Sequence, residues 1–205
     1  MNNGIFHCPL PIIHCPLRGS ARDCRVILSR NRWTALTDEQ LLAQCEVDTY
    51  RASGPGGQKR NKTSSAVRLR HPPSGFLVIA EESRSQHENK ARALRRLRQA
   101  FFLKLRDELS EGACTTDELA ARPELAHART AAGRLDVGRK DPRFWPAAGL
   151  ALDVLAAVGA RVSDAARLLS VSTGNLIDFL ESDPKLWEQA NILRHRHGQK
   201  PLKSA

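Results

Sequence analysis

The sequence has no apolar run long enough to span a membrane and no cysteine pattern that would indicate a disulfide-bonded domain. Nowhere in its 205 residues does an uninterrupted apolar stretch approach the roughly 18 residues that a membrane helix needs. Its five cysteines are odd in number and unevenly spread, which is not typical of a disulfide framework. We therefore expect no membrane partner and a reducing, cytoplasmic setting.

Acidic residues are scarce in one part of the chain. Residues 51–106 hold 14 Lys or Arg against only three Glu, whereas the remaining residues hold 18 basic and 19 acidic side chains. The whole net charge of +10 therefore originates in one segment. A localised basic excess in a small protein indicates a nucleic-acid partner, since a surface that needed only solubility would not concentrate its charge in this way.

The first residues carry a repeated tetrapeptide, His-Cys-Pro-Leu, at 7–10 and again at 14–17. Adjacent His-Cys pairs lack the two-residue gap that is usual between metal ligands, and prolines stiffen the segment. We therefore expect no metal and no cofactor, and we interpret residues 1–36 as a flexible leader. Five arginines between positions 18 and 32 leave an organelle-targeting segment open.

Periodicity and capping residues predict a small α+β domain over residues 37–109, a short mixed sheet packed by a long helix. Thr37, with Gln40 three residues later, has the form of a capping box and predicts a short helix. Alternation and turn residues predict strands at 46–51, 66–70 and 76–80. Apolar residues at spacings of three and four then predict a helix that is capped by Ser83 or Ser85 and ends near Leu109.

The second half of the chain is predicted to be all helical. We expect a linker over residues 110–145, then a helical module over residues 146–205 with a basic C-terminal tail. Within that module, residues 162–180 have the pattern of a helix-turn-helix, with Ser172 as the cap of the second helix. Such hairpins either bind nucleic acid or only pack, and the pattern leaves both alternatives open.

The loop between the first two strands contains Gly56, Gly57 and Gln58. Adjacent glycines permit backbone angles that other residues resist and a close approach to a crowded ligand. The loop has no Cys nucleophile, no His general base and no phosphate-binding Lys-Ser/Thr pair. If it is catalytic, it must therefore act by positioning and electrostatics.

The Gly-Gly-Gln triplet lies inside a longer string, residues 48–69, which continues through 72–75 and 83–91. This string resembles the catalytic domain of class I bacterial-type peptide-chain release factors and their codon-independent ribosome-rescue relatives. The likeness covers about residues 38–106, half of the chain.

The resemblance implies a ribosome-dependent ester hydrolase, with the large-subunit rRNA and peptidyl-tRNA as partners. Gly56, Gly57 and Gln58 would enter the peptidyl-transferase centre and promote the attack of water on the peptidyl-tRNA ester. The Gln58 backbone N–H would stabilise the developing charge, and its side chain would position the water. The family's glutamine is often N-methylated, so Gln58 is a candidate for that modification.

Polar and basic residues around the triplet are expected to contact RNA phosphates and 2′-hydroxyls. A first group flanks the loop, and a second group opens the long helix and resembles the family's other basic-polar patch. The expected contacts are Arg51, Ser53, Lys59, Arg60, Asn61, Lys62, Ser64, Arg68 and Arg70, followed by Gln86, His87, Asn89 and Lys90.

Reading a stop codon would require a large decoding domain, and only about 35 residues precede Leu36. No tripeptide resembles the family's stop-codon readers of the Pro-x-Thr or Ser-Pro-Phe kind. We therefore expect a monomeric, codon-independent rescue hydrolase. Release on split or damaged ribosomes, and a non-catalytic ribosome- or RNA-binding role, remain as alternatives.

Overall fold

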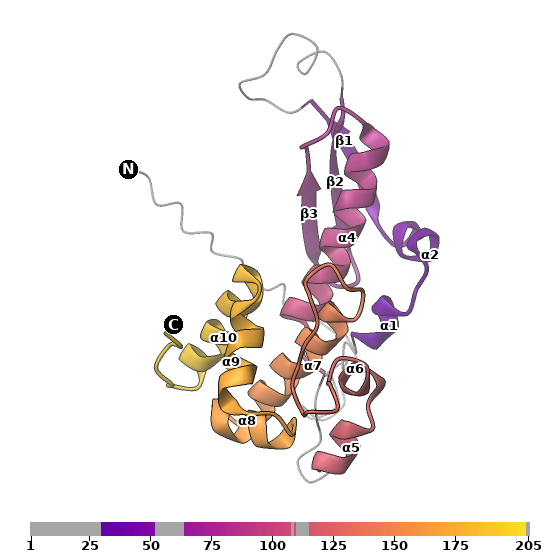
Figure 1. The fold of residues 1–205 in the computed structure, drawn as a ribbon. Helices are drawn as coiled ribbons and strands as arrows, with labels where there is room; N and C mark the ends of the chain where they lie inside the picture. The colour runs from indigo at the N-terminus through magenta and orange to yellow at the C-terminus, as the bar shows by residue number, and fades with distance from the viewer. Residues whose placement is uncertain (1–29, 52–63, 108, 110–114, 204–205) are drawn as a thin grey trace, which may run out of the picture.

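A computed structural model describes residues 30–51, 64–107, 109 and 115–203 of the chain. Its first half is a three-stranded sheet in the order β1 (Glu46–Tyr50), β2 (Ala66–His71) and β3 (Phe76–Ala80). The helix α4 (Gln86–Lys104) packs along one face of this sheet (Figure 1). The α+β class is confirmed, but the sheet is antiparallel throughout rather than mixed, because each strand reverses the direction of its neighbour.

The local signals for these elements act as expected. Helix α2 (Asp38–Ala43) begins with the Thr37–Gln40 capping box. Ser85 caps α4 by accepting a hydrogen bond from the backbone N–H of Glu88. The helix ends before the expected Leu109, because Leu105 already has an extended backbone. The core of this half is formed where β2 meets α4 and α1 (Asn31–Thr34), with Leu69, Leu97 and Phe101 fully buried.

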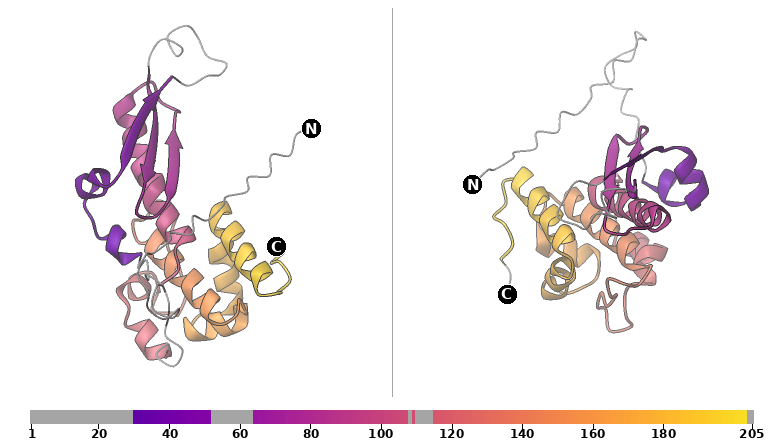
Figure 2. Two further views of the ribbon diagram at one scale, coloured as in Figure 1. Left: turned by 180° about the vertical axis from the view of Figure 1, so that it is seen from behind. Right: turned by 90° about the horizontal axis from the view of Figure 1, so that it is seen from above.

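Helix α4 is shared by two hydrophobic cores. Its middle packs on the sheet, whereas Leu103 belongs to the core of a helical module built around α7 (Phe144–Ala157). Three more helices surround α7, as Figure 2 shows: α8 (Val162–Leu168), α9 (Thr173–Glu181) and α10 (Pro184–Arg196). At 1.5 Å per residue, the 19 residues of α4 span about 28 Å between its two ends.

The segment expected to be a linker, residues 110–145, contributes to the core of the helical module from residue 115 onward. It contains α5 (Thr116–Ala120) and α6 (Pro123–Ala126), and it buries Leu119, Leu125 and Leu135. Its helices are too short to give an apolar periodicity, so the sequence resembles a loop. Asn175, from α9, fixes this segment by accepting a hydrogen bond from the Leu135 N–H and donating one to its carbonyl.

The last part of the expected flexible leader is also ordered. Trp33, in α1, is 2% exposed and stacks on Phe101 of α4. Arg30, which precedes α1, is 3% exposed. Short segments of this kind are stabilised by tertiary contacts and not by their own helix propensity. Residues 1–29, with the repeated tetrapeptide, lie outside the described part of the chain.

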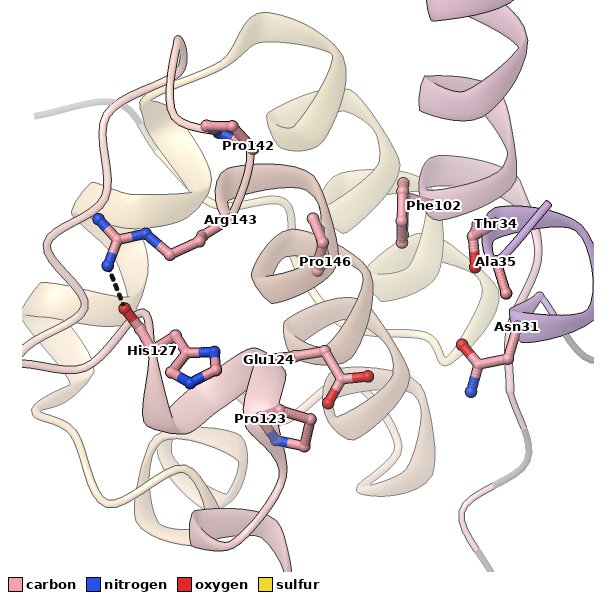
Figure 3. A pocket seen from close by; sticks show the side chains of 10 residues that line it. All are labelled: Asn31, Thr34, Ala35, Phe102, Pro123, Glu124, His127, Pro142, Arg143 and Pro146. Carbon is pink, nitrogen blue, oxygen red and sulfur yellow. Dashed lines mark hydrogen bonds between the residues drawn. The ribbon is translucent and has the colours of Figure 1, made fainter. Parts of the chain in front are cut away.

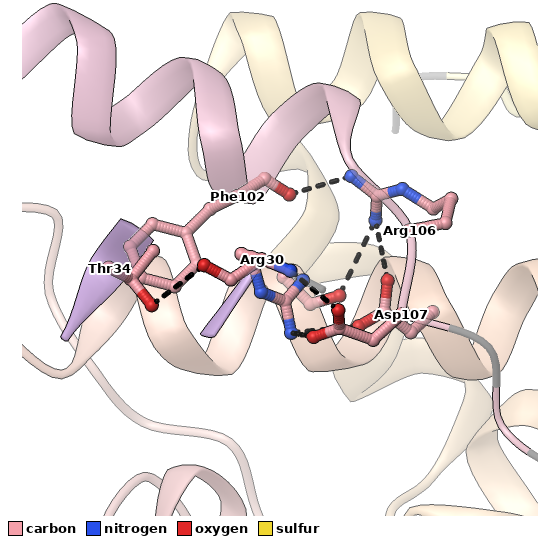
Figure 4. A network of polar contacts seen from close by, with 7 residues as sticks. Arg30, Thr34, Phe102, Arg106 and Asp107 are labelled. Carbon is pink, nitrogen blue, oxygen red and sulfur yellow. Dashed lines mark hydrogen bonds and ion pairs between the residues drawn. The ribbon is translucent and has the colours of Figure 1, made fainter. Parts of the chain in front are cut away.

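A buried ion-pair network joins the two halves (Figure 4). The Arg30 guanidinium lies 2.8 Å from a carboxylate oxygen of Asp153 in α7 and 3.2 Å from one of Asp107. Arg106 pairs with the other oxygen of Asp153 at 3.2 Å and donates to the carbonyl of Phe102. Burial raises the pKa of Asp153 to about 6 although both arginines oppose the shift, and it lowers the pKa of Arg106 to about 10.

The C-terminal segment, expected to be a basic tail, is folded onto the module. Residues up to Arg196 belong to α10. Beyond the helix, the carbonyl of Lys200 accepts a hydrogen bond from Arg194, and the N–H of Leu202 donates to Asn191. The predicted helix-turn-helix corresponds to α8 and α9, with Ser172 as the cap. Among the helices of the described residues, none has the length and apolarity needed to cross a bilayer.

Removal of the central carboxylate tests whether the network holds the two halves together. Asp153→Ala leaves Arg30 and Arg106 buried with too few anionic partners, so we expect the free energy of unfolding to fall by about 3–5 kcal/mol. Urea denaturation measures this change. Asp164→Ala is the matched control, because it removes a surface carboxylate that also pairs with two arginines, Arg161 and Arg167. An equal, small effect of both substitutions would contradict the assigned role.

Candidate functional site

The Gly-Gly-Gln loop falls between β1 and β2. Residues 52–63 lie outside the described part, and they include Gly56, Gly57 and Gln58 as well as the expected RNA contacts Ser53, Lys59, Arg60, Asn61 and Lys62. The two ends of the loop are described, and both Arg51 and Ser64 are exposed. They lie at the end of the sheet that is far from the helical module (Figure 1).

Asn89 is a buried anchor for one end of this loop. Its side chain is fully buried, and its amide donates to the carbonyl of Ser65 at 2.6 Å and to the carbonyl of Ser83 at 2.8 Å. The Ser83 N–H in turn donates to the Asn89 side-chain oxygen at 3.0 Å. The expectation that Asn89 contacts RNA is therefore corrected: its polar atoms are satisfied within the protein, and it joins the start of β2 to the start of α4.

The other residues of the expected second patch lie on the surface. Gln86 and His87 are exposed and Lys90 is half-buried, all in the first turns of α4. The hydrogen bond from Asn89 to Ser65 brings these turns beside the end of the loop. The structure thus gathers Arg51, Ser64 and the first turns of α4 at one end of the sheet, although they are distant in sequence.

Arg68 and Arg70 lie on the sheet face that α4 does not cover. Arg68 pairs with Asp48 at 3.8 Å and lies over the Tyr50 ring, with 5.1 Å from its guanidinium carbon to the ring centroid. Arg70 pairs with Glu46 at 3.6 Å. These ion pairs are long and solvent-exposed, so they stabilise the sheet little. Both guanidinium groups therefore remain available to a partner.

Tyr50 connects this face to the segment that follows β3. Its hydroxyl donates to a carboxylate oxygen of Glu81 at 3.2 Å. Desolvation, together with the nearby Glu81 carboxylate, raises the pKa of Tyr50, and Arg68 acts in the opposite direction. The Tyr50 hydroxyl therefore stays protonated near neutral pH and can donate this hydrogen bond, which fixes the end of β1 just before the loop.

A cavity of about 400 Å³ lies at the junction of α1, α4, α6 and α7 (Figure 3). His127, Glu124 and Arg143 line it, and Arg143 donates to the carbonyl of His127 at 3.0 Å. The sequence does not predict this cavity, because its walls come from segments expected to be leader and linker. Within the described residues, no group of three or more His, Cys, Asp or Glu side chains is arranged to hold a metal ion.

Comparison with known proteins identifies the first half of the chain. Residues 40–132 match the sequence model of the RF-1 domain, and the match continues past α4 through α5 and α6. A segment of 60 residues is 55% identical to peptide chain release factor 2 of Acidithiobacillus ferrooxidans; it covers 29% of this chain and 16% of that protein.

Two further relatives give the same result. A segment of 70 residues is 54% identical to peptide chain release factor 2 of Janthinobacterium sp. (strain Marseille); it covers 34% of this chain and 19% of that protein. A segment of 69 residues is 48% identical to peptide chain release factor 1 of Anaplasma marginale (strain Florida); it covers 32% of this chain and 19% of that protein. The similarity thus spans less than a fifth of each of these relatives. These matches support the resemblance of residues 40–132 to the class I release factor domain that contains the Gly-Gly-Gln string.

Proposed function

We propose that this protein hydrolyses the ester of peptidyl-tRNA in the peptidyl-transferase centre of the large ribosomal subunit, without reading a codon. The observation that carries the proposal is the Gly56-Gly57-Gln58 triplet between β1 and β2 of a matched RF-1 domain. The relatives in the comparison are named as peptide chain release factors, which supports the same chemistry for this chain.

In the proposed reaction, the oxygen of a water molecule attacks the ester carbonyl carbon. The bond from that carbon to the ribose oxygen of the tRNA breaks, and the leaving oxygen takes up a proton. Gln58 would supply a backbone N–H to the developing negative charge and a side-chain amide to orient the water. The loop provides no acid–base pair, so the proposed contribution of the protein is positioning and electrostatic stabilisation.

The described residues support this proposal by the way they present the loop. Asn89 and Tyr50 fix its two ends, on β2 and β1 respectively. Those ends lie beside the first turns of α4, whereas Leu103, near the other end of the helix, packs in the core of the helical module. The loop would therefore be able to enter an RNA-walled site while the module remains outside it.

The codon-independent part of the proposal rests on two observations. The 205 residues contain no tripeptide of the Pro-x-Thr or Ser-Pro-Phe kind. The second observation concerns the helix-turn-helix of the helical module, α8 and α9. Helix α9, the second helix of the helix-turn-helix, has no Lys or Arg among its nine residues, which favours packing over nucleic-acid contact for this hairpin.

Substitution of the proposed catalytic glutamine should separate chemistry from binding. We expect Gln58→Ala to lower the single-turnover rate of peptide release by on the order of 10²–10³, because a positioned donor is lost from the transition state. Binding to ribosomes, measured by co-sedimentation, should be unchanged. Gln199→Ala, near the C-terminus, is the matched control. Full release by Gln58→Ala would disprove the catalytic assignment and favour a non-catalytic binding role.

Release should not depend on the codon in the decoding site. We expect similar release rates from purified ribosomes that carry peptidyl-tRNA with no downstream mRNA, with a sense codon or with a stop codon. The three rates are measured at the same saturating protein concentration. Release restricted to a stop codon would contradict codon independence, and release restricted to isolated large subunits would favour a split-ribosome target.

Asn89 should affect both stability and the rate of release. Asn89→Ala leaves the buried Ser65 carbonyl and Ser83 N–H without partners, which should cost about 1–3 kcal/mol of folding free energy. Displacement of the loop end should lower the release rate at saturating protein by on the order of 10²-fold. Asn175→Ala is the control, because it removes a similar buried amide in the helical module and should destabilise the fold without slowing release. Equal release by both variants would show that Asn89 is only structural.

A further inference from the structure

A second surface feature lies farther along α4, between that helix and the start of α7. A cavity of about 630 Å³ is lined there by Arg92, Arg95, Arg96 and Arg98 from α4 and by Trp145 and Pro146 from α7. Its α4 residues come from the middle and the second half of the helix, beyond the first turns that lie beside the Gly-Gly-Gln loop. The cavity exists only because the helical module packs against the RF-1 half.

Two of the four arginines, Arg96 and Arg98, are held in place by the protein. Arg96 binds the Glu82 carboxylate and the Ile79 carbonyl, and Arg98 binds Asp38 together with the Leu36 carbonyl. The contacts of Arg96 and Arg98 fix their guanidinium groups, so less side-chain entropy is lost when they donate their remaining N–H groups to a ligand. Arg92 lies 3.7 Å from Glu88 in a long, exposed pair, so its guanidinium group remains available to a partner.

Arg95 is different from its neighbours. It is exposed, and no acidic side chain of the described residues lies within ion-pair distance of it. It therefore contributes a full, uncompensated positive charge to the cavity. Guanidinium groups in a fixed array of this kind favour ligands with repeated, bidentate oxygen acceptors, such as phosphodiesters.

Two aromatic side chains also line the cavity, Trp145 from α7 and Phe102 from α4. Trp145 is half-buried, and its ring meets Phe144 edge-on at 5.0 Å. Arginines and an exposed part of an aromatic ring in one cavity are the combination that binds single-stranded nucleic acid, because phosphates contact the charges while bases stack on the rings.

The cavity continues into the smaller one shown in Figure 3. The two share Thr34, Phe102, Pro142 and Pro146 as lining residues. The two cavities therefore adjoin one another between the middle of α4 and α6, and we call the pair the groove. An extended strand fits two adjoining cavities better than a compact small molecule does.

We propose that this groove binds single-stranded RNA, with a base stacked on Trp145 and the adjoining phosphates on Arg95 and Arg92. An RNA duplex is a poorer fit, since its bases remain stacked on one another and do not reach an aromatic side chain. The inference goes beyond peptidyl-tRNA hydrolysis, because it assigns a contact to residues outside the loop and does not depend on Gln58. It gives the helical module a function, the completion of an RNA-binding groove.

Fluorescence anisotropy with a 5′-labelled 12-nucleotide single-stranded RNA tests the proposal on the full chain. We expect Trp145→Ala to weaken binding by about 5- to 150-fold, the range that corresponds to the loss of one stacked base. Arg95→Glu should also weaken binding, because it removes a phosphate contact and adds a negative charge. Arg134→Glu and Trp187→Ala are the matched controls, since Arg134 is exposed and Trp187 half-buried elsewhere in the module. The slope of log Kd against the logarithm of the salt concentration reports the number of phosphate contacts. We expect this slope to be smaller by about 0.7 in Arg95→Glu than in the natural sequence.

Three additional measurements distinguish binding in the groove from binding at the loop. Gln58→Ala should bind the oligonucleotide like the natural sequence, so loss of release and loss of groove binding are distinguishable. Trp145→Phe keeps an aromatic ring, so its affinity for the RNA should lie within about threefold of that of the natural sequence. This variant can be measured even if Trp145→Ala folds poorly. Photocrosslinking of 5-bromouridine RNA should label α4 and the start of α7.

Three outcomes would overturn the proposal. The first is that Arg95→Glu and Trp145→Ala leave binding like that of the controls, and that Arg95→Glu leaves its salt dependence unchanged. The second is that crosslinks occur only in residues 51–64, which would assign RNA binding to the loop alone. The third is that a 12-residue polyglutamate peptide displaces the RNA and binds with the same affinity as the RNA. That result would favour an acidic protein as the occupant of the groove.

Discussion

The arrangement of this protein depends on the charges buried where α4 meets α7. Arg30, Arg106 and Asp153 come from three distant parts of the sequence, and the Asp153 carboxylate, which is fully buried, pairs with both guanidinium groups. Gly149 leaves the space for this contact, since a Cβ at that position would lie 2.6 Å from the Arg30 guanidinium. An apolar contact of similar size has no preferred direction, whereas these ion pairs form only when the guanidinium groups meet the Asp153 carboxylate, which we interpret as the advantage of the network.

That junction makes α4 a rigid connection between two different surfaces. One end of the helix is joined to the start of β2 through Asn89, and the other end is enclosed by the helical module. A loop that acts by positioning, without an acid–base pair of its own, requires a support of this kind, because small displacements of a positioned group are costly for the rate. The same rigidity keeps the groove between α4 and α7 open at a fixed distance from the loop.

The sequence predicts those parts of the fold that depend on local signals. The Thr37–Gln40 capping box, the strands of the sheet and the Ser172 cap all reflect contacts between residues close in the chain. Arg30, Trp33 and Leu119 cannot be assigned to a core from the sequence, because their burial depends on segments far away and their own neighbours show no periodicity. The prediction that Asn89 contacts RNA is wrong for the same reason: sequence alone does not distinguish a buried amide from an exposed one.

The basic excess of residues 51–106 is a single feature of the sequence but has several roles in the fold. Arg106 belongs to the buried junction, and Arg96 and Arg98 are paired with carboxylates that attach α4 to β3 and α2. Arg95, together with the exposed residues at the loop ends, keeps charge that is free to act on a partner. The number of phosphates that this surface neutralises must therefore be smaller than the net charge suggests. The salt dependence of binding is proportional to the number of phosphates that the protein neutralises. It therefore reports the number of arginines and lysines that are free to contact RNA, and not the total number of basic residues.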